Sequence, residues 1–340
     1  MEPQFSNNVG ATAAPVAKPR IYWLDFGKVL AAFLVVFAHV IYAEDSFLCS
    51  VIWAFHLPFF FLISGIFHKD RQKIDWKTHA QRLLLPAFIF CFFDALYYVI
   101  YNGIVSGEGL HGFVSQAVIY AKYFILRMLR GHELGPAWFL FALFWCRVLG
   151  DLFLLIKNRW ISGGILLAGL LVPYLLGFRF PFFLSQGFMA MPFYLAGYFG
   201  STWLKTRKPS WKYLAVTAVC LVATVLLTRW NGKVSMNGFY FGSLPVGLNL
   251  VVFYLNGFIG SAMLLSIALL PLPEFKSVKM LASALITIVG VQSIFLGLTG
   301  LLFKGAERII PYAILISIVI LWLCYLVHLL IGPLYTPKKK

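Results

Sequence analysis

Long apolar runs, separated by short polar stretches, make up most of this chain. A helix needs about 20 mostly apolar residues to cross the hydrocarbon core of a bilayer, and ten runs approach that length. The pattern therefore predicts an all-α polytopic membrane protein with about ten transmembrane helices. The predicted spans are residues 21–43, 51–68, 82–104, 136–156, 161–178, 186–204, 212–230, 245–270, 280–302 and 309–331.

One further apolar stretch, residues 113–130, differs from these spans because it carries Lys122, Arg127 and Arg130. A helix with one basic and one apolar face is typical of segments that lie in the plane of the membrane. We interpret this stretch as an amphipathic helix at the outer interface rather than as an eleventh span. Ten spans place both termini on the same side.

The placement of the basic residues sets the expected orientation. The chain has 28 Lys and Arg residues, a net charge of +16 and only 12% charged residues. Most of the basic residues fall in segments that face the cytoplasm if the N-terminus is cytoplasmic, as the positive-inside rule requires. Because they gather at the ends of apolar segments, they indicate topology and contact with anionic lipid, and no nucleic-acid partner is expected.

Three regions follow from this pattern. Residues 1–19 are predicted to be a disordered cytoplasmic tail, residues 20–333 a transmembrane domain, and residues 334–340 a basic cytoplasmic tail. The five cysteines form no CxxC pair, and the chain has no HExxH motif. No metal site is therefore expected.

The first span contains the first candidates for chemistry. Lys28 and His39 are separated by three helical turns plus about 20°, so that their side chains share one face and lie about 16 Å apart along the axis. Asp25, one turn before Lys28, is expected to pair with it. Ionisable groups in a span usually line a cavity or pathway. We therefore expect a polar conduit beside this helix, with Lys28 at its inner mouth and His39 at its outer end.

The second span adds another histidine. His56 falls near the predicted start of this span, at about the same outer depth as His39, and Pro58 suits an early helical turn. Two imidazoles at one depth favour a proton-transfer centre, although each could simply bond to a backbone carbonyl. At the inner end, Ser64 and Gly65 form a small pair that would let another backbone or a ligand approach closely.

Two charged residues fall near the middle of their predicted spans. Asp94 and Arg147 could pair with each other or contact a substrate. Asp151, one turn from Arg147, is a competing partner.

The segment GHELGPAW at residues 131–138 is predicted to lie at the outer surface. Its Trp138 could be an interfacial anchor or could stack on a sugar ring, and Glu133 is a further candidate for substrate binding.

Several motifs resemble one family. RIYWLDFGKVLAAFLVVFAHV at residues 20–40 resembles the opening of the acyltransferase 3 family of integral membrane O-acyltransferases, whose signature is a basic residue, ten others and a histidine. Here these are Lys28 and His39, with lysine where arginine is commoner. FHLPFFFLISG at residues 55–65 resembles a motif of the fucose 4-O-acetylase-like subgroup. Weaker resemblances follow in the same order: RLLLPAFIF, AWFLFALF and MPFYLAGYFG.

The resemblance implies an enzyme of the bacterial cytoplasmic (inner) membrane that takes acetyl-CoA from the cytoplasm. The acetyl group would go to a sugar hydroxyl of a surface or secreted polysaccharide, with a lipid-linked repeat unit as the expected acceptor. His39 would be the general base, or would carry the acetyl group transiently. His56 would orient His39 or protonate the leaving thiolate.

The remaining candidate residues are expected to bind either the acetyl donor or the sugar acceptor. Lys28, Ser64 and Arg82 are expected to bind acetyl-CoA, and Trp138, Glu133 and Arg147 are expected to bind the acceptor. Members of the subgroup often have a histidine where this chain has Gln292, so a third imidazole is not expected there.

A rival hypothesis comes from a different class of protein. Lys28, His39 and His56 could form the pathway of a proton-coupled transporter or a glycolipid flippase. Thioester turnover without a membrane gradient would separate an enzyme from a transporter.

Overall fold

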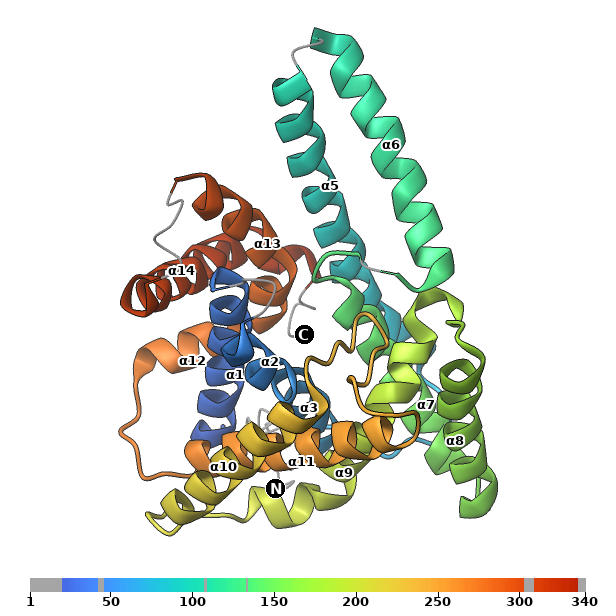
Figure 1. Ribbon diagram of the computed structural model, residues 1–340, viewed down its shortest axis with the longest axis vertical. Coiled ribbons are helices and arrows are strands. Elements are labelled where there is room, and N and C mark those ends of the chain that lie inside the picture. Colours follow the sequence, from blue (N-terminus) through green and yellow to red (C-terminus); the bar gives the residue numbers. More distant parts are fainter. Residues whose placement is uncertain (1–19, 42–45, 107–108, 133, 303–308, 336–340) are drawn as a thin grey trace, which may run out of the picture.

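The computed structural model describes residues 20–41, 46–106, 109–132, 134–302 and 309–335. The predicted tail at residues 1–19 and the last five residues of the chain lie outside this part, as does Glu133. Throughout the described part the regular structure is helical (Figure 1). The helices are α1 (Tyr22–Val40), α2 (Phe47–Trp53), α3 (His56–Ile66), α4 (Trp76–His79), α5 (Leu85–Ser106), α6 (Gly109–Arg130), α7 (Trp138–Leu155), α8 (Arg159–Leu176), α9 (Leu184–Lys205), α10 (Tyr213–Asn231), α11 (Leu248–Ala268), α12 (Lys276–Ser283), α13 (Leu285–Leu302) and α14 (Ile310–Tyr335).

The described residues contain eight helical stretches long and apolar enough to cross a membrane, and nine if α12 and α13 form one broken span. The axes of α12 and α13 meet at 80°. The prediction of an all-α membrane protein is confirmed, but one predicted span, residues 186–204, is not among these stretches. Its helix, α9, contains Ser185, Gln186 and Tyr194 and is packed against α3 and α7. Because neighbouring helices cover α9, it does not need a lipid-compatible surface.

Helix α1 lies at the centre of the bundle and packs against α3, α11, α12, α13 and α14. Its Leu24, Ala31 and Val36 are each at most 1% exposed. The N-terminal end of α1 is held by Tyr22, whose hydroxyl donates to the Pro273 carbonyl at 3.0 Å. The first span thus forms a scaffold helix, and its two ends can present side chains to different sites.

The second span is broken. Helices α2 and α3 meet at Ala54 and Phe55, and the apolar stretch begins at Phe47 rather than at residue 51. His56 therefore lies at the break, in the middle of the apolar stretch and at the first residue of α3. Its depth in the membrane stays a prediction. Helix α11 lies close to this break, since a Cβ on Gly260 would be 2.2 Å from the Phe55 Cβ.

Helices α3 and α9 cross at two glycines. A Cβ on Gly65 would be 1.9 Å from the Tyr194 carbonyl oxygen, and one on Gly197 would be 1.9 Å from the Leu62 carbonyl oxygen. The close approach expected at Ser64 and Gly65 is therefore made by the backbone of α9.

Helices α5 and α6 form a long antiparallel hairpin that extends away from the rest of the bundle (Figure 1). Tyr98 on α5 and Tyr120 on α6 stack with their rings 5.7 Å apart, and Asn102 donates to the Tyr120 hydroxyl at 3.0 Å. The predicted helix at residues 113–130 is thus present as part of α6. Its location at a membrane interface stays a prediction.

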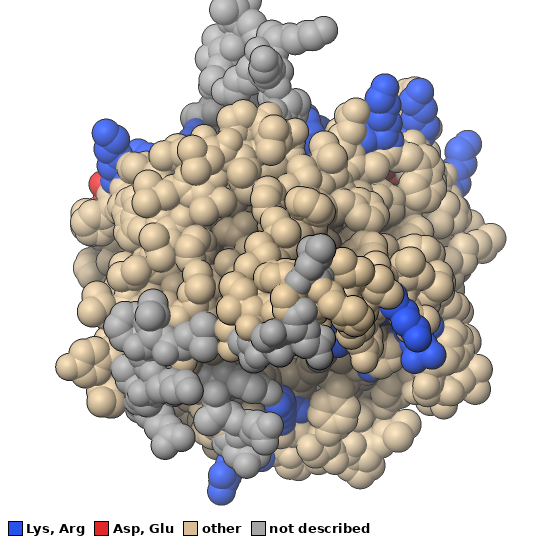
Figure 2. Space-filling view, turned by 90° about the horizontal axis from the view of Figure 1, so that it is seen from above, with Lys and Arg blue, Asp and Glu red and all other residues tan. Residues whose placement is uncertain are grey.

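The surface agrees with a membrane environment. Figure 2 shows a face formed largely by uncharged side chains, with Lys and Arg gathered mainly toward its edges. Exposed Phe, Leu, Ile and Val side chains are spread over α5, α8, α10 and α14. In water such an apolar surface would be costly, whereas in lipid it is the expected surface.

Candidate active site

A cavity of about 900 Å³ lies between α1, α3, the α5–α6 hairpin and α13, and is closed in part by the segments 134–138 and 234–237. A cavity of this size can hold a small organic ligand. His39, His56, Asp94, Trp138 and Gln292 all line it. The structure thus brings together two of the predicted catalytic residues and one predicted acceptor residue.

His39 lies in the last turn of α1 and is exposed at the cavity. Its neighbours Ala38 and Val40 are buried, at 0% and 8% exposure. The end of α1 is therefore packed around this one accessible imidazole. An accessible imidazole in a ligand-sized cavity can exchange a proton with a bound hydroxyl group.

His56 is the first residue of α3 and is 5% exposed. Its Nδ1 lies 2.8 Å from the carbonyl oxygen of Ile52. A carbonyl only accepts hydrogen bonds, so Nδ1 carries the hydrogen and Nε2 has the free lone pair in the neutral ring. His56 is therefore a proton acceptor in this arrangement. It can act as an acid only after it has taken up a proton.

Asp94 and Gln292 contribute another wall of the cavity, formed by α5 and α13. Ser293 donates to Asp94 Oδ1 at 2.8 Å. The expected pair of Asp94 with Arg147 is not formed, because Arg147 does not line the cavity and lies within electrostatic range of Asp151 and Tyr194. The sequence predicts how deep each of these residues lies in the membrane, but it does not show which helices are adjacent.

Trp138 begins α7 at the cavity and is 6% exposed. The segment before it turns sharply at Gly131 and Gly135, which have φ of +59° and +54°. Such backbone angles favour glycine. The segment GHELGPAW thereby forms part of the cavity wall, although the position of Glu133 lies outside the described residues.

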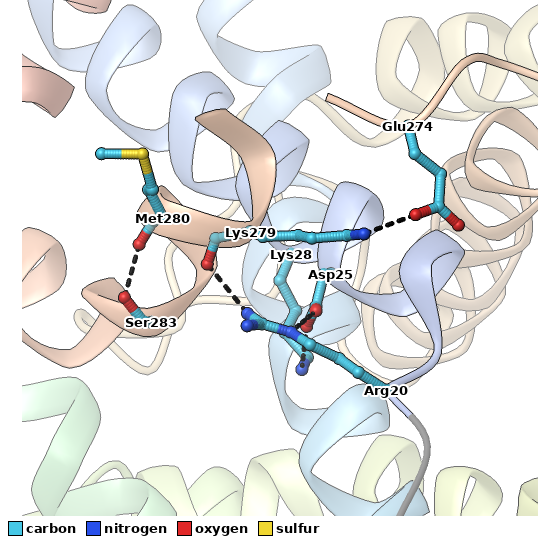
Figure 3. Close-up of polar contacts among 7 residues, drawn as sticks. All are labelled: Arg20, Asp25, Lys28, Glu274, Lys279, Met280 and Ser283. Atoms are coloured by element: carbon cyan, nitrogen blue, oxygen red, sulfur yellow. Dashed lines mark hydrogen bonds and ion pairs between the residues drawn. The ribbon is translucent and has the colours of Figure 1, made fainter. Parts of the chain in front are cut away.

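Lys28 lies away from the cavity, in a polar cluster at the other end of α1 (Figure 3). The predicted pair is present: Lys28 Nζ lies 3.2 Å from Asp25 Oδ1. Arg20 also pairs with Asp25 and donates to the Lys279 carbonyl at 2.9 Å. Lys28 further lies over the ring of Phe67, 4.8 Å from its centroid. This end of α1 is therefore a basic, partly open surface.

No open conduit joins the two ends of α1 in the described part of the chain. Ala31, Ala32, Val35 and Val36 lie between Lys28 and His39, and each is at most 7% exposed. The cavity reaches His39 but not Lys28. The expected continuous path is thus closed by packed side chains in this structure.

Ser64 and Arg82 also lie away from the cavity. Ser64 is half-buried near the α3–α9 crossing, and Arg82 is exposed in the π-helical turn Ala80–Leu84 that leads into α5. The structure therefore separates the expected donor residues from the two histidines.

Sequence reasoning missed a second buried polar group, which we call the Asp151 cluster: His68, His79, Asp151 and Tyr194. Asp151 is 1% exposed, and its two oxygens lie 3.3 Å from His68 Nε2 and 2.8 Å from His79 Nε2. The Tyr194 hydroxyl lies 2.8 Å from His68 Nδ1. This cluster ties the basic segment between α3 and α5 to α7 and α9. Two histidines flanking that segment were the available signal, but nothing in the sequence indicated Asp151 as their common partner.

The described residues contain no group of three or more His, Cys, Asp or Glu that could hold a metal ion. The two imidazoles at the cavity are of a type that suits transfer of a proton during attack of a hydroxyl on an activated acyl group.

These features define a class of protein, a multi-pass membrane protein with two histidines at a ligand-sized cavity. A family model described as an acyltransferase domain matches residues 21–329, and the chain belongs to this acyltransferase 3 family. The resemblance to the acyltransferase 3 family is confirmed, and the protein is a membrane acyltransferase. The resemblance to the fucose 4-O-acetylase-like subgroup stays a prediction. No curated protein and no solved structure matches the chain.

Proposed function

We propose that this protein transfers an acetyl group from acetyl-CoA to a sugar hydroxyl of a surface or secreted polysaccharide, most simply on a lipid-linked repeat unit in a bacterial cytoplasmic membrane. The observation that most directly supports this proposal is the position of His39, an accessible imidazole in a ligand-sized cavity of an acyltransferase-family protein. The acceptor enters this cavity, and acetyl-CoA supplies the acyl group.

His39 takes the proton of the acceptor hydroxyl while the hydroxyl oxygen attacks the thioester carbonyl carbon. The new C–O bond forms, the C–S bond breaks, and coenzyme A leaves as a thiolate. The thiolate then takes the proton from the His39 imidazolium. His56, whose Nε2 has a free lone pair, suits holding a protonated partner in place better than donating the first proton.

The basic surface around Lys28 is the proposed contact for the phosphate groups of acetyl-CoA. Lys205 strengthens it, since its ammonium lies 5.7 Å from the same Phe67 ring that Lys28 contacts. Because buried side chains such as Ala32 and Val35 are packed between Lys28 and His39, the donor reaches His39 only when helices next to α1 separate.

The experiment uses purified protein in detergent with acetyl-CoA and a deacetylated glycan fraction from membranes that lack this protein. We expect release of the coenzyme A thiol and transfer of labelled acetate to the glycan, both without a membrane gradient. His39→Ala should reduce the rate at least a hundredfold, as removal of a general base does.

A matched control is His111→Gln, at an exposed position on α6. Activity that requires sealed vesicles, with no thioester turnover in detergent, would contradict the proposal and favour a proton-coupled transporter or a flippase.

A further inference from the structure

The cavity wall formed by α5 and α13 carries polar side chains that have no part in the proposed proton transfer. Asp94 lies on this wall, and Ser293 is its hydrogen-bond partner within the described part of the chain, at Oδ1. Gly135 lies next to the other oxygen: a Cβ at this position would be 3.1 Å from Oδ2. Glycine at this turn therefore leaves space beside the carboxylate.

Gln292 lies next to Ser293 in the sequence and lines the same cavity. Its side chain is 2% exposed, and its Oε1 has no hydrogen-bond partner in the part of the chain that the structure describes. The same holds for Oδ1 of Asn237, another lining residue. A buried oxygen without a partner costs free energy unless a ligand or water satisfies it.

These groups share one property, which is that they accept hydrogen bonds. A carboxylate oxygen and two amide oxygens require a ligand that presents several donors. The hydroxyl groups of a sugar ring are such donors, and Trp53 and Trp138 supply aromatic surface in the same cavity. Arg127 also lines the cavity, so the wall carries a basic side chain as well as the carboxylate, and a neutral ligand is the simpler fit.

We infer that Asp94, together with Gln292, is the specificity-determining element for the acceptor and binds adjacent hydroxyl groups of a neutral sugar ring. This inference rests on the proposed acetyl transfer and adds to it the residues that select and orient the acceptor. Ser293 holds the carboxylate in place, and Gly135 keeps Oδ2 accessible. His39 and His56 then act on a hydroxyl of the ring that Asp94 has oriented.

The test measures two KM values, one for acetyl-CoA and one for the deacetylated glycan fraction, together with acetyl-CoA hydrolysis in the absence of glycan. Asp94→Asn keeps the size of the side chain but removes its charge and one acceptor oxygen. We expect the glycan KM to rise about tenfold or more, since hydrogen bonds to a charged group are among the stronger ones. The acetyl-CoA KM and the hydrolysis rate should stay within twofold of wild type.

Gly135→Ala is a second variant, because its methyl group would press on Oδ2 while Asp94 remains. It should raise the glycan KM in the same selective way. Glu274→Gln is the control for exchanging an acid for an amide, since Glu274 is exposed and lies before α12, outside the cavity. Its glycan KM should match that of wild type.

An unchanged glycan KM in Asp94→Asn, with wild-type transfer intact, would overturn this inference and leave the proposed function standing. Equal loss of hydrolysis and transfer in a folded Asp94→Asn protein would also overturn it, because Asp94 would then serve the chemistry or the scaffold. A methyl glycoside of an amino sugar that inhibits wild type better than its neutral counterpart, and loses this advantage in Asp94→Asn, would show a cation site instead. Absence of any thioester turnover by the wild type would refute the proposed function itself.

Discussion

At the residue scale, the main finding is that similar side chains receive different roles from their surroundings. His39 is open to the cavity, His56 is tied to a backbone carbonyl, and His68 is held by a carboxylate and a tyrosine. The two histidines at the cavity are the ones for which we propose a part in proton transfer. His68 is buried in a cluster that links separate segments.

The position of Lys28 leads to a kinetic prediction. Lys28→Ala removes a cation from the basic end of α1, where the phosphate groups of acetyl-CoA are proposed to bind. The KM for acetyl-CoA should rise about tenfold, the scale of one charge-assisted contact, with a smaller effect on kcat. Lys276→Ala, at an exposed lysine of α12, is the control. An unchanged acetyl-CoA KM in Lys28→Ala would remove Lys28 from the donor site.

The surroundings of His68 predict a pH dependence of stability. Burial lowers the pKa of His68, and the nearby Asp151 carboxylate opposes this only in part. The unfolded chain, with a histidine pKa of about 6.5, therefore binds this proton at a higher pH than the folded protein. Stability should fall as the pH drops below about 6.5, by up to about 1.4 kcal/mol per pH unit from this residue.

Thermal unfolding of the detergent-solubilised protein between about pH 5 and 7.5 tests this expectation. His68→Gln should make the decline on acidification less steep, whereas His111→Gln should keep the wild-type slope. An identical slope in His68→Gln and wild type would show that His68 does not contribute.

At the scale of elements, packing decides which segments can come close enough to build the site. Helix α9 is a predicted span that is not among the apolar stretches able to cross a membrane, and α3 and α7 pack against it. The break between α2 and α3 places His56 at the start of α3, beside the cavity. Both features depend on neighbouring helices rather than on the segments themselves.

The α3–α9 crossing gives a prediction for stability. Gly65→Ala would place a methyl group 1.9 Å from the Tyr194 carbonyl oxygen, so the helices must move apart. Overpacking of this kind costs about 1 to 3 kcal/mol, and the melting temperature should fall. Gly164→Ala on α8 is the control, because nothing lies within 4 Å of the added Cβ. A melting temperature of Gly65→Ala at or above that of Gly164→Ala would contradict the described crossing.

At the scale of the whole molecule, the structure separates two regions along α1. One end carries the Arg20, Asp25 and Lys28 cluster, and the other opens on the cavity. A closed, apolar segment lies between them. An enzyme that joins a charged donor from one side to an acceptor on the other side needs such a barrier between turnovers, because an open path would let water hydrolyse the thioester.

Much of this organisation was predictable from the sequence. Lipid requires every backbone polar group to be satisfied within the segment, so long apolar runs had to be helices, and nine of the ten predicted spans coincide with apolar helical stretches or the bent α12–α13 pair. The Lys28 to His39 spacing on one helix and the Asp25 to Lys28 pair depend only on local geometry. The family followed from the motifs.

Contacts between distant segments were decided only by the tertiary structure. Nothing in the sequence indicated that Asp94 would bond to Ser293 rather than pair with Arg147, or that His68 and His79 would share Asp151. Within a helix, position follows from fixed rise and rotation per residue, whereas the neighbours of a helix follow from how all the side chains of the bundle pack at once. The candidate catalytic residues could therefore be predicted from single segments of the sequence. The cavity proposed to bind the acceptor could not, because it is formed by several helices that are distant in the sequence.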